Sequence, residues 1–320
     1  MIEILEAGPQ TTVQDEGRPG FLAEGLARGG AADRRALREA AALLGGAGAA
    51  IEVAGAGLRL RLHAAATVAL TGAPMRADVG GRLLAWHAAH ALAAGDELAL
   101  RPGGGVFGYV TPAGGVATEP VMGSRAVQAA FGIGRPLRAG DRLPVGGGTV
   151  PERRLAAPED RFAGGTLRCM PTPQTALFAP AEVERFEATA FRRDPRGDRR
   201  GVRLASDAAG FETAGQLALL SDFVLPGDVQ MTGDGTPYIL GPDAQTTGGY
   251  PRIAHVVAAD LPRAMQAPPG ASLRFRMIGV AEARLIALSR PATAPLLRDP
   301  TGIRDLGAFQ LIDGVVDARG

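Results

Sequence analysis

The chain has 320 residues, of which 46% are hydrophobic and 21% charged, so it is long and apolar enough to bury a core and suggests two domains. Its net charge of +1 argues against nucleic acid as a partner, and no apolar run approaches the roughly 20 residues of a membrane span. The acidic, strand-like start differs from a signal peptide, and the single cysteine excludes an internal disulfide, so we expect a cytoplasmic protein.

Short apolar runs recur between 46 glycines and 24 prolines, a pattern that predicts many short strands joined by tight turns. Residues 58–62, with the sequence LRLRL, alternate as a half-buried strand does. Asp234-Gly235 lies between two further runs and predicts a hairpin. Other strands are expected at residues 67–71, 97–100, 106–110, 167–170, 255–257 and 273–278.

Helices are expected in few segments. Leu37, Ala40 and Leu44 share one face of a helix predicted at residues 33–45. Asp33 would cap its start and Gly45 would end it. Further helices are expected at residues 180–191, 260–266 and 279–288, so the chain is predicted to be mainly β with a few helices.

A stretch rich in proline, glycine and charge, residues 144–165, shows little periodicity and predicts a linker. We therefore expect an N-terminal β-barrel-like domain over residues 1–150 and a C-terminal β-barrel domain over residues 165–290. Residues 291–320 are expected to form a tail, with a small hairpin at Asp313-Gly314 as one interpretation.

The segment DAQTTGGYPRIAH, residues 243–255, joins two strand-like runs and is too long and too polar for a plain hairpin. Gln245, Thr246 and Thr247 can each donate and accept hydrogen bonds. Gly248 and Gly249 would let a ligand reach backbone N–H groups, which can cradle an anion. The alternative interpretation is a turn that caps itself.

Other side chains could complete a site with this segment. Arg252 could hold a carboxylate at two points, and Tyr250 lies beside it. His255 could act as a base, although a strand histidine with a structural partner is the alternative. Gln230, inside an apolar run, needs either an internal partner or a pocket.

Two charged stretches are further candidates. Asp198, Arg199 and Arg200 belong to RRDPRGDRRGVRL, which is either an anion-binding cluster or a solvated loop. Asp15 and Arg18, in TTVQDEGRPGF, either contact substrate or pair locally. His87 and His90 have helical spacing but no evident third ligand, so no metal site is predicted.

All 34 basic residues are arginines, because the sequence contains no lysine. A lysine is needed to form a Schiff base, to complete a phosphate-loop motif or to carry covalent biotin. If biotin or a lysine-bound nucleotide takes part in the reaction, another chain must supply it.

Several motifs occur in a characteristic order, among them GPQTTVQDEGRPGF, VALTGA, VMGSRA, PGDVQM and GPDAQTTGGYPRIAHVVAADLPR. Over about residues 2 to 290 they resemble the allophanate hydrolase subunit 2 family, also called the biotin-dependent carboxyltransferase family. The resemblance implies two cyclophilin-like β-barrel domains. It also implies an activity like that of its members in bacterial 5-oxoprolinase: ATP-dependent hydrolysis of 5-oxo-L-proline to L-glutamate, as the C subunit, together with subunits A and B.

Under that resemblance, Gln245, Thr246, Thr247 and the Gly248-Gly249 backbone would orient the lactam. Arg252 or the group at Asp198 to Arg200 would hold its carboxylate. ATP would be used by the assembled complex. Two alternatives stay open: a carboxyltransferase component that acts on urea or another amide with a biotinylated partner, and a non-catalytic regulatory partner of a subunit 1-like, kinase-inhibitor-like protein.

Overall fold

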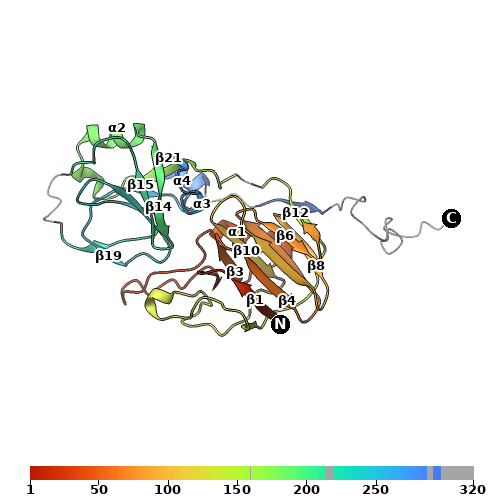
Figure 1. Cartoon of the computed structure of the whole chain (residues 1–320). Coiled ribbons are helices and arrows are strands. Elements are labelled where there is room, and N and C mark those ends of the chain that lie inside the picture. The colour runs from red at the N-terminus through yellow and green to blue at the C-terminus, as the bar shows by residue number, and fades with distance from the viewer. Residues whose placement is uncertain (159, 214–218, 287–290, 297–320) are drawn as a thin grey trace.

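The computed structural model describes residues 1–158, 160–213, 219–286 and 291–296, and it consists of two β-rich units side by side (Figure 1). The mainly β fold is as predicted. Within the described residues, no helix is long and apolar enough to cross a membrane. The helices are α1 (Arg34–Leu44), α2 (Pro180–Ala188), α3 (Leu261–Gln266) and α4 (Val280–Ile286), with 3-10 turns η1 (Ala129–Phe131) and η2 (Thr175–Leu177).

The N-terminal unit consists of two sheets that enclose one core. The first sheet has the order β11 (Arg142–Leu143), β1 (Ile2–Ala7), β4 (Leu58–Leu62), β9 (Glu97–Arg101), β6 (Arg76–Val79), β7 (Arg82–Leu84). The second has the order β2 (Thr12–Gln14), β3 (Ala50–Ala54), β10 (Phe107–Pro112), β5 (Ala66–Gly72), β8 (Ala88–Leu92), β12 (Arg153–Leu155), β22 (Thr293–Pro295).

The alternation in β4 produces the predicted half-buried strand. Leu58, Leu60 and Leu62 are buried in the core between the sheets. Arg59 and Arg61 point outward, where their guanidinium groups bind Glu97 on β9 at 3.0 and 2.6 Å. Apolar burial on one face and exposed ion pairs on the other fix the register of this strand.

The C-terminal unit is a closed barrel. Its strands follow the order β13 (Gly165–Met170), β20 (Arg252–Val256), β17 (Asp228–Met231), β18 (Pro237–Leu240), β15 (Gly201–Ala205), β14 (Phe191–Asp198), β21 (Ser272–Met277). Beside it, β16 (Asp222–Phe223) pairs with β19 (Thr247–Gly248). Phe186 of α2 stacks on Phe275 of β21 at 4.3 Å between ring centroids, so α2 packs against the barrel.

The predicted helices and hairpin are confirmed within the described residues. The Asp33 carboxylate accepts a hydrogen bond from the N–H of Ala36 at 3.1 Å, and Gly45 ends α1 in the left-handed conformation at φ 76°. The hairpin at Asp234-Gly235 joins β17 to β18. By contrast, His90 lies in strand β8 (Ala88–Leu92), which begins immediately after His87. The helical spacing of these two histidines therefore does not correspond to a helix.

The segment expected to be a linker contains structure that its composition does not reveal. Strand β12 pairs with β22, so residues 293–295 return to the N-terminal unit. Arg161 is 1% exposed and binds the carboxylates of Asp33 and Glu39 at 2.7 and 2.8 Å. The hairpin suggested at Asp313-Gly314 lies outside the described residues.

A buried polar network connects the two units. Arg199, in the turn between β14 and β15, donates to the carboxylate of Glu52 on β3. The other oxygen of Glu52 accepts from the N–H of Ala32 at 2.8 Å and from the hydroxyl of Tyr109 at 2.7 Å. Gln266 of α3 adds a second bridge, because its amide nitrogen donates to Asp33 at 3.0 Å. The apolar core around this network is continuous from one unit to the other.

Replacing Arg199 with Met should destabilise the protein by about 3–5 kcal/mol, because Glu52 would remain buried without its cation. The matched control is Arg200→Met. Arg200 is an exposed neighbour that pairs with Asp198, so its loss should change the free energy of unfolding by less than about 1 kcal/mol. Urea unfolding measures both values, and equal effects would contradict the interdomain role of Arg199.

Burial, followed by the nearby Arg161 cation, lowers the pKa of His87 from 6.5 to about 4. Below pH 6.5 the imidazole therefore binds a proton in the unfolded chain but not in the folded one. The free energy of unfolding should fall between pH 6.5 and 4 by on the order of 3 kcal/mol. His87→Asn removes this loss while tolerating the positive φ of 56°. Urea unfolding of the wild type and the variant at pH 7.5 and 4.5 measures this loss of stability. The same pH dependence in both proteins would exclude His87 as its cause.

Candidate functional site

The segment QTTGGYP, residues 245–251, which we call the QTTGGYP loop, is anchored by a distant part of the chain. Thr247 and Gly248 form β19, whose partner is β16. The N–H of Val224 donates to the carbonyl of Thr246 at 3.0 Å, and Val224 packs with Ala244 in a small buried cluster. The course of the loop is thus set by contacts outside it, whereas Thr247 and Tyr250 are exposed to solvent.

Two glutamine amides meet at the loop, one from Gln245 within it and one from Gln230 on β17. Gln245 donates from Nε2 to Oε1 of Gln230 at 3.2 Å. Gln230, on β17, is 3% exposed, and among the described residues its own Nε2 has no hydrogen-bond partner. A buried donor without an acceptor costs about 1–3 kcal/mol. This nitrogen lies close to Gly248, where an added Cβ would be only 2.9 Å away.

A polar row crosses the barrel wall on β17 and β20. Asp228 lies opposite His255, and its carboxylate is 2.8 Å from Nδ1 of the imidazole. The other carboxylate oxygen accepts from the N–H of Leu225 at 2.9 Å. Asp228 thereby fixes the imidazole with Nδ1 toward its carboxylate, which leaves Nε2 as the nitrogen that can exchange a proton with a ligand or water.

Arg252 is the other end of this row. Its guanidinium donates to the carbonyl of Phe223, the carboxylate of Asp222 and the side-chain oxygen of Gln174, the last at 3.1 Å. Arg252 therefore ties β16 to the barrel beside the QTTGGYP loop. Its predicted contact with a substrate carboxylate stays a prediction.

Asp15 and Arg18 fasten one distant segment of the chain. The Asp15 carboxylate accepts from the hydroxyl of Ser124 and the N–H of Arg125, both at 2.6 Å. Arg18 is buried and donates to the carbonyl of Ala126 at 2.5 Å and to the side chain of Gln128. The structure thus gives both residues structural partners, and their contact with substrate stays a prediction.

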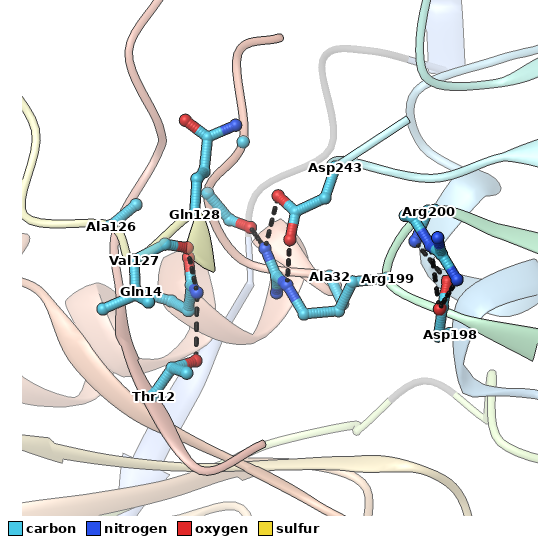
Figure 2. Close-up of polar contacts among 12 residues, drawn as sticks. Thr12, Gln14, Ala32, Ala126, Val127, Gln128, Asp198, Arg199, Arg200 and Asp243 are labelled. Atoms are coloured by element: carbon cyan, nitrogen blue, oxygen red, sulfur yellow. Dashed lines mark hydrogen bonds and ion pairs between the residues drawn. The ribbon is translucent and has the colours of Figure 1, made fainter. Parts of the chain in front are cut away.

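The cluster at Asp198 to Arg200 is divided by the fold. Figure 2 shows Arg199 pointing to Asp243, with its Nε 2.7 Å from that carboxylate, while Arg200 and Asp198 pair with each other to one side. All of the guanidinium nitrogens of Arg199 donate to Glu52, Asp243 and the carbonyl of Gly30. The structure therefore does not bring these three residues together as one anion-binding group.

Three of the site candidates, Gln245, Arg18 and His255, line two adjoining hollows between the units. A hollow of about 190 Å³, the Gln245 cavity, is lined by Gln245 and Arg18. A hollow of about 410 Å³, the arginine cavity, is lined by His255, and both hollows share Arg28. The sequence analysis missed the arginines of the second hollow, although their density at the start of α1, without an acidic residue in its first turn, was a signal. The remaining shared wall consists of Leu225 and Pro226.

Comparisons with known proteins agree with this architecture. The family described as carboxyltransferase domain, subdomain A and B, matches residues 24–277. The sequence is 36% identical to the C subunit of the Escherichia coli 5-oxoprolinase, over 88% of this chain and 93% of that protein. It is 26% identical to the urea amidolyase of Lachancea kluyveri, over 93% of this chain but 18% of that protein. The crystal structure of TTHA0988 is similar with a TM-score of 0.77 and 31% identity, over 86% of this chain and 55% of that chain.

Gly248→Ala tests the geometry of the glutamine pair. The new Cβ would lie 2.9 Å from the flexible end of Gln230, so we expect its amide to move while the free energy of unfolding changes by less than about 1 kcal/mol. In Gly249→Ala the nearest atom would be 3.4 Å away, an ordinary contact, which makes this variant the control. Side-chain amide signals of Gln230 in NMR spectra should shift only in Gly248→Ala; an unchanged signal there would contradict the placement.

Proposed function

This chain belongs to the carboxyltransferase domain family, subdomain A and B, and from that membership we propose that it is the C subunit of a 5-oxoprolinase. It would act with subunits A and B to hydrolyse 5-oxo-L-proline to L-glutamate in an ATP-dependent reaction. The observation that carries the proposal is that the similarity to the C subunit from Escherichia coli runs through nearly the whole of both chains.

The cleft has chemistry that suits a lactam. A lactam presents one carbonyl acceptor and one N–H donor, and a side-chain amide can match both. The unpartnered Nε2 of Gln230 would donate to the lactam oxygen, with Gln245 and the backbone of Gly248 beside it. When the ring opens, negative charge develops on that oxygen, and a donor already in place is typically worth about 2.7–4 kcal/mol in the barrier.

His255 supplies a group for proton transfer. Asp228 holds Nδ1, so Nε2 is the nitrogen that would deliver a proton to the departing ring nitrogen or take one from water. Thr246 is 8% exposed and its carbonyl anchors the loop, whereas the exposed Thr247 can face a substrate or a partner. We therefore propose positioning for Thr246 and direct contact for Thr247.

Partner subunits are part of the proposal. The chain contains no lysine, so ATP would be used by the assembled complex without a phosphate loop in this subunit, and no biotin would be attached here. Phe223 and Tyr250, which are 50% and 47% exposed beside the QTTGGYP loop, offer an apolar surface for the B subunit to cover. We place the complex in the cytoplasm.

A second candidate is a carboxyltransferase component for urea or another amide, which the match to urea amidolyases over 93% of this chain supports. That reaction needs a biotinylated partner. Inhibition of turnover by avidin would favour it, and full turnover of 5-oxoproline without biotin would exclude it.

The complex reconstituted from subunits A, B and this chain should release glutamate from 5-oxoproline and ATP. Gln245→Ala and Thr247→Val should each lower kcat about 10²-fold if these side chains stabilise the developing charge. Thr166→Val, an exposed threonine on β13, is the control and should keep full activity. Unchanged rates in the first two variants would refute the site, and absence of glutamate would refute the proposed function.

A further inference from the structure

The arginine cavity has a wall of four arginines, two of which have no carboxylate partner among the described residues. Arg28 lines it from the loop before α1, and Arg34, Arg35 and Arg38 line it from α1. Arg34 donates to the carbonyl of Gly29 at 3.1 Å, and Arg38 has no ion-pair partner among the residues that the structure describes. Glu16 lies 3.9 Å from Arg28, and Glu39 lies 3.5 Å from Arg35.

Two enclosed arginines elsewhere in the protein are matched with carboxylates. Arg161 binds Asp33 and Glu39. Arg199 binds Glu52 and Asp243 in the same way. Arg34 and Arg38, at the arginine cavity, have no such carboxylate partner among the described residues.

Helix α1 brings three of these arginines close together. The cavity lies against the start of α1, where Arg34, Arg35 and Arg38 crowd the first turns behind the Asp33 cap. Burial, together with the nearby Arg28 and Arg38 cations, lowers the pKa of Arg34 to about 10. An anion in the cavity would relieve this repulsion.

The opposite wall is apolar. It is formed by Leu225, Pro226, Ala258, Leu261 and Pro262, with His255 among them. His255, whose Nδ1 is held by Asp228, is shared with the proton transfer proposed above. A volume of about 410 Å³ falls in the range of pockets that hold small organic ligands, roughly 300–1,000 Å³.

We propose that the arginine cavity binds the phosphate group of a small phosphorylated organic molecule, whose apolar part lies along the proline and leucine wall. One bidentate arginine satisfies a carboxylate, whereas several guanidinium groups around one point suit the higher charge and additional oxygens of a phosphate. This site adjoins the Gln245 cavity through Arg28 but is separate from the glutamine pair, and it does not depend on the proposed function.

The test is isothermal titration of the isolated full chain in phosphate-free buffer with inorganic phosphate, adenosine 5′-monophosphate and 5-oxoproline. We expect both phosphates to bind, the nucleotide at least about tenfold more tightly because it also covers apolar surface. In Arg34→Gln and Arg38→Gln the affinity for both should fall about tenfold or more. Arg82→Gln, an exposed arginine on β7, is the control and should bind as the wild type does.

Thermal melting gives a second measurement. Without ligand, Arg38→Gln should melt no lower than the wild type, because the change removes charge from a crowded wall, yet phosphate should no longer raise its melting temperature. Absence of phosphate binding, binding that Arg34→Gln and Arg38→Gln leave intact, or binding of 5-oxoproline alone would overturn the proposal. Equal affinity for the two phosphates would overturn the role of the apolar wall. None of these measurements needs the partner subunits, so their failure would leave the proposed function standing.

Discussion

The buried carboxylate of Glu52 is the constraint on which the arrangement of the two units depends. A carboxylate at 0% exposure is held only if cations and donors surround it, and its own unit supplies neutral donors, from Tyr109 and Ala32. Arg199 of the barrel supplies the cation. Burial alone would lower the pKa of Arg199, but Glu52 and Asp243 reverse the effect, so its pKa lies above the ordinary value. Arg199 is thus charged, and docking of the barrel is the way that the first unit satisfies Glu52.

This docking also fixes the walls of the cleft. Arg199 reaches the carbonyl of Gly30, just before α1, and the carboxylate of Asp243, just before the QTTGGYP loop. Burial, and next the Glu52 charge, raise the pKa of Tyr109, which keeps its proton and donates to Glu52. One guanidinium group therefore sets the distance between the segment that carries the arginine cavity and the loop at which the two glutamine amides meet.

Local patterns in the sequence predicted the elements, because periodicity and capping act over a few residues. The alternation in β4, the Asp33 cap of α1 and the hairpin at Asp234-Gly235 are of this kind. Contacts between distant residues have no such pattern: Asp15 meets Ser124, and Arg161 meets Glu39 across a segment that resembled a linker. The polarity and length of the QTTGGYP loop indicated a site, yet its partners on β16 and β17 could only come from the fold.

The net charge of the chain likewise differs from the positions that the fold gives to its charged side chains. A net charge of +1 argues against binding to a long polyanion such as nucleic acid. It does not show where positive and negative side chains are paired in the fold. The fold places bidentate arginine pairs at Arg161 and Arg199, a geometry that a lysine would not reproduce. In the part of the chain that the structure describes, it leaves Arg34 and Arg38 at the cleft without carboxylate partners. A nearly neutral chain can thus hold a cavity at which two arginines lack carboxylate partners among the described residues.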